Sequence, residues 1–562
     1  MDSCLTQKIP VSLPVWRKYS SAPKITGYSE ITSLTPIIKE FLPNAESEGQ
    51  IQADELFARC TQFEGSGECI IETVSKKKKK AYCKVTHLLD PELMLKGYYN
   101  KEDKGEERKQ KKINNPMNQA YVDALANYLL GQLRERKISP HFCSFYGGFK
   151  GIAETYRFNI SDDFESFRLY KDFWNRRRDG LFSLYLDTGD EEPEVTEDIK
   201  WITTTPKSSL HSTPFSYISR NSSRSSLSIQ SHISLHDNPL EGTNVELESI
   251  HSADDIPIAE SVNTEEDDFD EDEEDDEEDD EEEIEIYAQF ENYPVMLIFQ
   301  EHMEGTLDDL LDEEFEDKEE RWTAWLFQVI AALCAAQGAL GFTHNDLHTN
   351  NIVWCDTEES WLHYRNRAGE VFRVPTFGKI FRIIDFGRAI FRIGDKWFVS
   401  DDYNKGGDAE GQYNFEQMKE YNANKKTIYP NPSFDLSRLS VSMLTALFSE
   451  QPTELLDGLV LSKEDEWEIK ETESKLWNLL WSWLIDDTGA NILCDQDGTE
   501  RFPDFDLYTH ITQHVLNAKP QEQITKDIFK SFLVDMSSSA KADKQPSVKK
   551  VGDWETVYPL FC

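Results

Sequence analysis

A long stretch of low apolar content divides this chain of 562 residues and limits what it can fold into. Residues 203–234 are rich in serine and threonine, and residues 265–283 contain 18 acidic side chains in 19 positions. Such a stretch cannot bury enough apolar surface to offset the conformational entropy that folding removes. We therefore expect residues 188–285 to be a disordered insert, whose serines are either phosphorylation sites or part of a solvated spacer.

The charge of the chain argues against binding to polyanions. Asp and Glu total 105 against 59 Lys and Arg, which gives a formal net charge of −46. Without the 18 charges of the acidic run the net charge is still −28. A field of this sign repels nucleic-acid phosphates and anionic membranes, so we expect neither a nucleic acid nor a membrane among the partners.

The cysteines and the apolar segments indicate a cytoplasmic, reducing compartment. The nine cysteines are odd in number and form no C-x-x-C pair, which argues against a disulfide framework or a zinc module. The N-terminus has no basic region followed by an apolar stretch, so no signal peptide is predicted. Residues 323–342 are apolar enough to suggest a membrane span, but Gln328 and Gln337 interrupt them, and we predict a buried core helix.

The rest of the chain divides by composition and periodicity. Residues 1–50 lack periodicity and read as a leader, and residues 537–562 read as a tail with a short aromatic end. The apolar spacing within residues 118–136 predicts a helix, and the continuous apolar run 295–299 predicts a buried strand. The lysine-rich residues 101–112 predict an exposed loop.

The segment H-N-D-L-H-T-N-N at residues 344–351 follows the apolar helix, and D-F-G begins at Asp385, 34 positions after Asn351. Two carboxylates and an amide suit phosphoryl transfer, which requires an acceptor hydroxyl held in line and magnesium held by hard oxygen ligands. Two alternatives remain. His344 and His348 are ordinary loop histidines with Asp346 as a cap, or the His-x-Asp-x-His spacing binds zinc, although no further His or Cys cluster supports zinc.

H-x-D-x-x-x-x-N followed by D-F-G resembles the catalytic loop and the magnesium motif of the protein-kinase superfamily. The resemblance implies an α+β, bilobal protein-kinase-like fold with a small β-rich N-lobe and a large helical C-lobe. It implies that Asp346 accepts the proton of the substrate hydroxyl, that Asn351 and Asp385 hold Mg²⁺, and that His344 is structural. The disordered acidic insert would then lie in the N-lobe.

The same resemblance divides the chain into lobes. The first part of the N-lobe would span residues 51–187, the last N-lobe strand and the hinge 286–303, and the C-lobe 304–536. Adenine would pair with the backbone near Glu301 and Met303.

Upstream, Gly65 and Gly67 form a short G-x-G, and Lys84 stands in a strand-like run. The resemblance implies that the glycines let backbone amides approach the phosphates of ATP and that Lys84 contacts them. The third glycine of the family's loop is missing, because Ile70 stands there, and a lone G-x-G fits a simple turn equally well.

Two further positions complete the comparison with the family. The helix partner of Lys84 is not obvious, since Asp123 and Gln119 both stand in the predicted helix. Asp435 would hydrogen-bond the backbone of the catalytic loop, with a simple helix cap as the alternative.

Departures from the family pattern are informative. Asn345 replaces the arginine that reads a phosphorylated activation loop, so we expect no dependence on such a switch. His348 replaces a lysine and is also typical of small-molecule phosphotransferases of the aminoglycoside and choline type and of divergent kinases such as haspin. The A-P-E motif is absent, and the long spacing from Asn351 to Asp385 predicts an extra hairpin around residues 364–377.

The overall pattern is similar to divergent serine/threonine-protein kinases of large DNA viruses, and the reducing compartment would then be a host cell or a virion. We expect a kinase that transfers the γ-phosphoryl group of ATP to Ser or Thr hydroxyls of a protein substrate. A small-molecule phosphotransferase is the first alternative. A pseudokinase scaffold, suggested by the incomplete glycine loop, is the second. The oligomeric state stays open.

Overall fold

The structure is a computed structural model. It describes residues 25–33, 35–41, 57–63, 67–73, 75–100, 104–187, 194–195, 285–311, 313–448, 459–461, 467–469, 474–493, 499–534 and 556–561. Most of the predicted leader, insert and tail therefore lies outside the described residues, as does Gly65.

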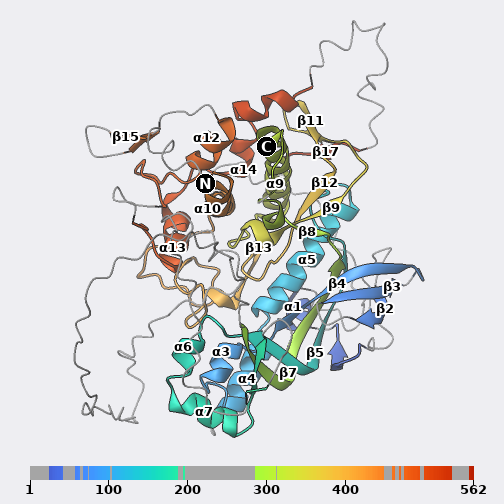
Figure 1. The fold of residues 1–562 in the computed structure, drawn as a ribbon, viewed down its shortest axis with the longest axis vertical. Coiled ribbons are helices and arrows are strands. Elements are labelled where there is room, and N and C mark those ends of the chain that lie inside the picture. The colour runs from blue at the N-terminus through green and yellow to red at the C-terminus, as the bar shows by residue number, and fades with distance from the viewer. Residues whose placement is uncertain are drawn as a thin grey trace, which may run out of the picture.

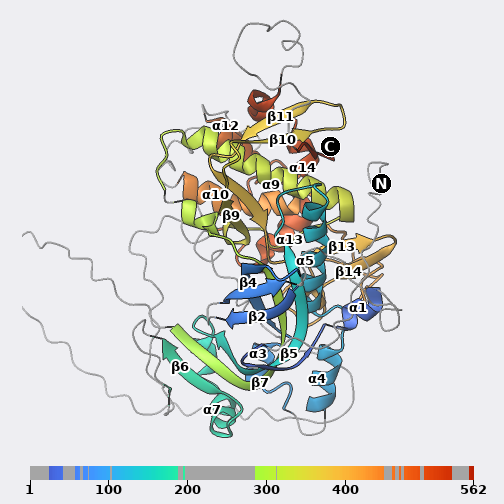
Figure 2. The ribbon, with the colours of Figure 1, turned by 90° about the vertical axis from the view of Figure 1, so that its right-hand side faces the viewer.

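The N-terminal half is built on an antiparallel sheet, which occupies the lower part of the molecule in Figures 1 and 2. Seven described strands form it in the order β1-β5-β7-β4-β3-β2, with β6 also paired to β7. The strands are β1 (Tyr28–Thr32), β2 (Phe57–Phe63), β3 (Glu68–Thr73), β4 (Lys78–His87), β5 (Phe145–Asn159), β6 (Ser183–Asp187) and β7 (Glu285–Glu301).

The predicted insert leaves and re-enters the sheet at one place. Strands β6 and β7 are antiparallel neighbours, and Asp187 at the end of β6 pairs with Glu285 at the start of β7. The cost of closing a loop grows only slowly with its length, so two adjacent paired ends tolerate a long connection. The sheet is therefore continuous across the gap in the described residues.

Strand β7 explains why its sequence is apolar at every position from 295 to 299. Successive side chains of a strand point to opposite faces. Val295, Leu297 and Phe299 enter one core together with Phe57 and Phe149. The intervening Met296 and Ile298 enter a second core that is shared with the helices. Both faces of the strand are buried, as predicted.

Helix α5 (Gln119–Glu135) lies between the sheet and the C-terminal helices (Figure 1). The Asn118 side chain caps its first turn by accepting a hydrogen bond from the Ala120 N–H at 3.1 Å. This confirms the predicted helix. The predicted loop at 101–112 is wrong over residues 105–112, because α4 (Gly105–Ile113) is a helix with acidic residues in its first turn and lysines in its last, which suits the helix dipole. Residues 101–103 lie outside the described residues.

Helix α9 (Lys318–Leu340) forms the centre of the C-terminal half. It is long and apolar enough to cross a membrane, but 89% of its most apolar window is buried inside the protein. The interrupting glutamines tie it to neighbouring segments. Gln328 donates to the Lys379 carbonyl at 3.1 Å, and Gln337 donates to the Pro432 carbonyl at 3.0 Å. The prediction of a core helix is confirmed.

Small sheets and helices surround α9 (Figure 2). The predicted extra hairpin is present as β10 (Trp361–Arg365) and β11 (Val371–Pro375), and β17 (Tyr558–Pro559) pairs with β10 in parallel. The remaining strands are β8 (Gly305–Thr306), β9 (Ile352–Asp356), β12 (Lys379–Ile383), β13 (Ile390–Ile393), β14 (Lys396–Val399), β15 (Leu459–Leu461) and β16 (Trp467–Ile469).

The remaining described helices complete the fold. They are α1 (Pro36–Phe41), α3 (Pro91–Leu95), α6 (Phe164–Phe167), α7 (Lys171–Arg178), α10 (Phe434–Leu447), α12 (Lys475–Ser482), α13 (Phe505–His514) and α14 (Pro520–Gln523), with the 3₁₀ turns η2 (Asp308–Leu310), η3 (Thr349–Asn351), η4 (Asp401–Tyr403) and η5 (Asp527–Phe532). The protein is thus a mixed α+β fold, with an antiparallel sheet first and helices later, as the predicted class requires.

Candidate active site

Lys84 on β4 lies between two carboxylates from distant parts of the chain. Its Nζ is 2.8 Å from Asp123 Oδ2 on α5 and 2.7 Å from Asp385 Oδ1 after β12. Burial alone would lower the pKa of Lys84, but the two carboxylates raise it above its usual range. Burial alone would raise the pKa of Asp385, but Lys84 lowers it. Burial raises the pKa of Asp123, and Lys84 offsets only part of that rise. We call Lys84, Asp123 and Asp385 the Lys84 cluster.

Asp123 is the helix partner that the sequence left open. Its side chain is 1% exposed. It also accepts hydrogen bonds from the Phe386 N–H at 2.9 Å and the Asn127 amide at 2.8 Å. The alternative, Gln119, instead lies against Gly387. Asp123 thus joins the sheet, α5 and the D-F-G segment through one buried carboxylate.

Asp385 adopts a backbone conformation that side chains rarely adopt, with φ of 63°. Its neighbours hold it there. The His344 Nε2 is 2.8 Å from the Ile384 carbonyl, and the Phe386 ring lies 5.6 Å from the His344 ring and 5.9 Å from Phe342. Such strain persists where surrounding contacts over-determine it, as they often do at functional sites.

Asp435 on α10 holds the backbone of the 344–351 segment. Its carboxylate is fully buried and accepts hydrogen bonds from the His344 N–H at 3.0 Å and the Asn345 N–H at 2.9 Å. The role predicted for Asp435 is confirmed, and the simple helix cap is excluded because the partners lie 90 and 91 positions away.

Asn351 lies beside Asp346, as the spacing of the motif predicts. Its Nδ2 donates to the Asp346 backbone carbonyl at 2.8 Å and lies 3.0 Å from His348 Nε2. Burial lowers the pKa of His348 to about 4, so the imidazole is neutral at pH 7. Its buried Nδ1 has no hydrogen-bond partner among the described residues.

Asn345, which stands where the family has an arginine, is bound entirely within the protein. It has φ of 64°, is fully buried, and donates to the Arg388 carbonyl at 2.9 Å. The Tyr413 hydroxyl donates to its Oδ1. Tyr413 belongs to a small core of the 390–418 segment, so Asn345 anchors that segment through neutral hydrogen bonds.

Three residues that the sequence analysis missed surround Asp346. The Tyr508 hydroxyl on α13 donates to Asp346 Oδ1 at 2.8 Å, and Arg388 Nη1 lies 3.7 Å from Asp346 Oδ2. Arg438 on α10 donates through Nε to the Tyr508 hydroxyl at 2.9 Å. We call these four residues the Asp346 cluster. Arg388 directly follows D-F-G and could have been noticed there. Tyr508 lies 162 positions from Asp346, and no local motif marks it.

The Asp346 cluster keeps its carboxylate ionised. Burial alone would raise the pKa of Asp346, but Arg388, His348 and Arg438 and the Tyr508 hydrogen bond lower it to about 2. An ionised carboxylate at neutral pH is able to accept a hydrogen bond from an acceptor hydroxyl.

Glu301, the last residue of β7, and Met303, just after the strand, both contact the Arg382 side chain. Arg382 Nη1 lies 2.6 Å from the Glu301 carboxylate and donates to Met303 Sδ at 3.2 Å, and Arg134 also pairs with Glu301. The Glu301 N–H donates to the Ser144 carbonyl at 3.0 Å, whereas the Met303 N–H makes no hydrogen bond to the described residues.

Gly67 lies at the end of the connection between β2 and β3. It has φ of 90°, its carbonyl accepts from the Cys83 N–H at 2.7 Å, and a Cβ there would lie 2.9 Å from the Cys83 carbonyl oxygen. Glycine is needed both for this conformation and for the close approach. Gly65 lies outside the described residues.

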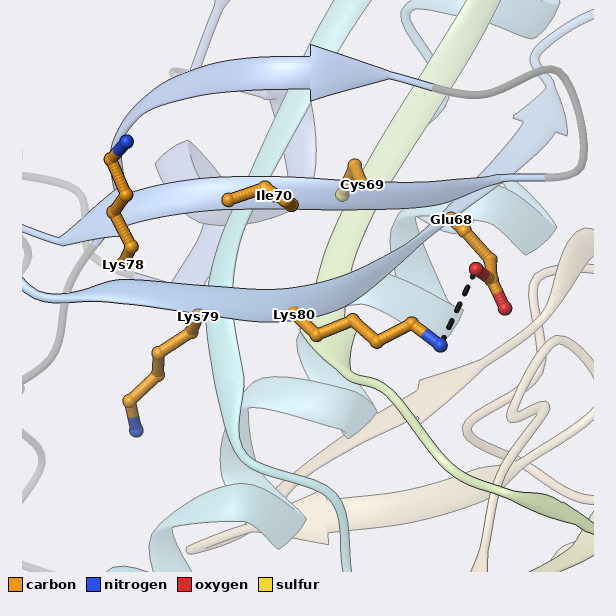
Figure 3. A pocket seen from close by; sticks show the side chains of 6 residues that line it. All are labelled: Glu68, Cys69, Ile70, Lys78, Lys79 and Lys80. Atoms are coloured by element: carbon orange, nitrogen blue, oxygen red, sulfur yellow. Dashed lines mark ion pairs between the residues drawn. The ribbon is translucent and has the colours of Figure 1, made fainter.

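The lysine run at 76–80 forms a turn and the start of β4, and most of its side chains are exposed. A hollow of about 370 Å³ opens beside it (Figure 3). It contains no residue of the Lys84 or Asp346 cluster, so we do not assign it to the candidate site. Lys80 reaches across it to Glu68 at 3.4 Å. The lining residues are Glu68, Cys69, Ile70, Lys78, Lys79 and Lys80.

Two oxygen donors near the D-F-G segment could contribute to a magnesium site. No group of three or more His, Cys, Asp or Glu within the described ranges is arranged to hold a metal. Asn351 makes its hydrogen bonds through Nδ2, and its Oδ1 accepts none from the described residues. That oxygen and the Asp385 carboxylate are hard ligands, which suit Mg²⁺ when phosphates supply the others.

We compared the chain with known proteins in two ways. No model of a known protein family matches it, and a search of curated proteins finds no match.

Proposed function

We propose that this protein is an ATP-dependent serine/threonine-protein kinase with a bilobal, kinase-like arrangement of its sheet and helical halves. One observation supports this above the others: Lys84 bridges Asp123 and Asp385. The sequence resemblance assigns Lys84 and Asp385 to the nucleotide. Lys84, Asp123 and Asp385 come from three separate segments of the chain. If the two motifs occurred by chance, nothing would bring these three side chains together.

Each residue has a chemical role under this proposal. Bound Mg²⁺–ATP would supply the phosphoryl group, with Asn351 and Asp385 holding the ion and Lys84 contacting the phosphates. Asp346, ionised at neutral pH, orients the acceptor hydroxyl and takes its proton at a carboxylate oxygen. Asp435 keeps the backbone of that loop in place. Phosphoryl transfer depends mainly on positioning and on electrostatic stabilisation, which these contacts provide.

A second candidate is transfer to a small hydroxyl compound. Tyr508 and Arg388 cover two sides of Asp346, whose side chain is only 22% exposed. Limited access of this kind favours a small acceptor. Competition between a protein acceptor and a panel of small alcohols and amino sugars distinguishes the two candidates.

The first experiment is transfer of labelled phosphate from Mg²⁺–ATP by the purified full-length protein. Asp346→Asn and Asp385→Asn should each lower transfer to protein acceptors by about 100-fold or more, because a catalytic base or a charge-stabilising ligand typically contributes that much. Asp527→Asn is the control, since its side chain is 84% exposed.

Transfer that survives in the Asp346 variant would mean that the base is misassigned. If wild-type protein transfers nothing and Mg²⁺–ATP does not raise its melting temperature, the kinase proposal is wrong and the scaffold reading gains support.

A further inference from the structure

Helix α13 brings a phenol hydroxyl onto the proposed catalytic base. Tyr508 is 3% exposed and donates to Asp346 Oδ1 at 2.8 Å. The other oxygen, Oδ2, has no hydrogen bond within the described residues and only the longer 3.7 Å ion pair with Arg388. The two oxygens of one carboxylate are therefore in different environments.

The direction of the Tyr508 hydrogen bond follows from its second partner. A phenol hydroxyl has one proton to donate, and an arginine side chain only donates. Arg438 Nε lies 2.9 Å from the Tyr508 oxygen and fills its accepting side. The single Tyr508 proton therefore points at Asp346. Arg438 makes no ion pair with a carboxylate in the described part of the chain, and its Nη1 is buried without a partner.

Tyr508 is held in place by contacts on both helices. Its ring lies 5.3 Å from the Phe505 ring and 5.8 Å from the Phe434 ring. The end of α13 is fixed by Asn431, whose amide donates to the carbonyls of Ile511, Thr512 and Val515 at 3.1, 3.2 and 2.8 Å. These contacts favour a permanent part of the site over a removable plug.

We propose that Tyr508, oriented by Arg438, is a positioning residue for Asp346. It occupies Oδ1 and leaves Oδ2 as the oxygen that receives the proton of the acceptor hydroxyl. This inference rests on the proposed function, because it gives Tyr508 a role in that reaction. It adds a residue that lies outside every motif used to propose the reaction.

The inference makes a specific demand on pH dependence. The charged and titratable groups around Asp346 are Arg388 after D-F-G, His344 and His348 in the loop, Arg438 on α10, Tyr508 on α13 and, across the site, Asp385. Removing only the Tyr508 hydroxyl leaves the other groups in place. It should weaken the stabilisation of the ionised carboxylate and raise the pKa of Asp346.

The test is Tyr508→Phe in the full-length protein, with Tyr293→Phe as the matched control. The buried Tyr293 hydroxyl donates to the Leu89 carbonyl at 3.1 Å, away from the site. We expect Tyr508→Phe to lower kcat roughly 10- to 100-fold, as expected for a lost hydrogen bond to a charged group. KM for ATP should stay within about twofold, and the acid limb of the rate profile should move to higher pH.

A second measurement does not depend on activity. In a thermal double-mutant cycle with Asp346→Ala, the melting-temperature changes of the two single variants should not add, because the residues contact each other.

The outcomes separate this inference from the proposed function. A higher kcat in Tyr508→Phe would identify an inhibitory plug, and an unchanged kcat and pH profile with additive melting temperatures would remove the positioning role. Either result leaves the kinase proposal intact, since wild type is active. If wild type transfers nothing, the proposed function fails first, and additivity in the cycle then overturns the inference as well.

Discussion

The Lys84 cluster and the Asp346 cluster hold their carboxylates in opposite ways. In the Lys84 cluster one ammonium is shared by two carboxylates, so negative charge is in excess. In the Asp346 cluster one carboxylate lies near Arg388, which is also paired with Asp402 and Asp408, and near Arg438, which has no ion-pair partner among the described residues. Under the proposed function, the first arrangement would attract a cation and the second would keep the catalytic base ionised.

The difference suggests a division of work within one site. Excess negative charge beside Lys84 is suited to a divalent cation and the phosphates that accompany it. Two arginines, Arg388 and Arg438, lower the pKa of Asp346 and keep its carboxylate ionised before the acceptor arrives. The predictions below remove one part of this contrast at a time.

The largest effect is expected when the shared cation is removed. Lys84→Met should reduce phosphoryl transfer by roughly 100- to 1,000-fold, because it removes a charge that stabilises the transferred group and leaves two carboxylates facing each other. Steady-state kinetics measure this. Lys80→Met is the control, since Lys80 lies on the same strand with its side chain 56% exposed. Equal activity in both variants would end the claim that the two clusters differ in function.

Asp435→Ala removes the carboxylate that holds the backbone of the 344–351 segment. That segment contains Asp346, and its His344 contacts the residue before Asp385. The substitution leaves the His344 and Asn345 N–H groups buried without partners, at about 1–3 kcal/mol each. We expect the free energy of unfolding to fall by about 2–5 kcal/mol in denaturant titrations. The exposed Asp527→Ala should leave the midpoint unchanged. A loss no larger than that of the control would show that the loop is held by other contacts.

Asp346→Ala tests how the stability contributed by the Asp346 carboxylate depends on pH. The pKa of Asp346 is lowered to about 2, so its ionised form stabilises the folded state above the unfolded value near 3.8. The shift corresponds to roughly 2 kcal/mol at pH 7. The stability gap between wild type and variant should therefore be largest near neutrality. It should shrink below about pH 4 and close as pH falls towards 2. A stability difference that grows at low pH would contradict the downward shift assigned to the pKa of Asp346.

The smallest effect concerns the turn next to the Lys84 strand. Gly67 and Gly180 both have positive φ, but a Cβ at Gly67 would meet Cys83 and Tyr82 at 2.9 Å, whereas Gly180 has open space. Gly180→Ala should cost about 1–2 kcal/mol from backbone strain alone. The free energy of unfolding should fall further in Gly67→Ala, because the added Cβ would also crowd Cys83 and Tyr82. Thermal unfolding compares them, and equal losses would mean that the turn adapts freely.

The 344–351 motif could be recognised from the sequence because its residues lie close together in the chain. His344, Asp346 and Asn351 occupy one short segment, and the backbone of that segment dictates their proximity. The same local reasoning failed for residues 105–112, where a charged patch suggested an exposed loop. There the acidic start and basic end of α4 satisfy the helix dipole, a feature that composition alone conceals.

The choice of Asp123 over Gln119 shows where sequence reasoning stops. Both residues stand on the predicted helix four positions apart, so helical periodicity places them on the same face, one turn apart. Which of the two lies level with Lys84 depends on how far α5 is shifted along its axis against the sheet. That position is set by packing between the cores, so no pattern within the helix reports it.

The α+β class was implied by the resemblance of the motifs to a known family. By itself the sequence determined the core helix around Gln328 and Gln337, the extra hairpin and the segment that contains Asp346. Each depends on residues near one another in the chain, where periodicity and spacing act directly. Only the tertiary structure decided that Asp123 pairs with Lys84 and that Tyr508 and Arg438 complete the surroundings of Asp346. Those contacts join segments up to 162 positions apart, and they form because burial of α5, α10 and α13 brings their polar side chains to one place.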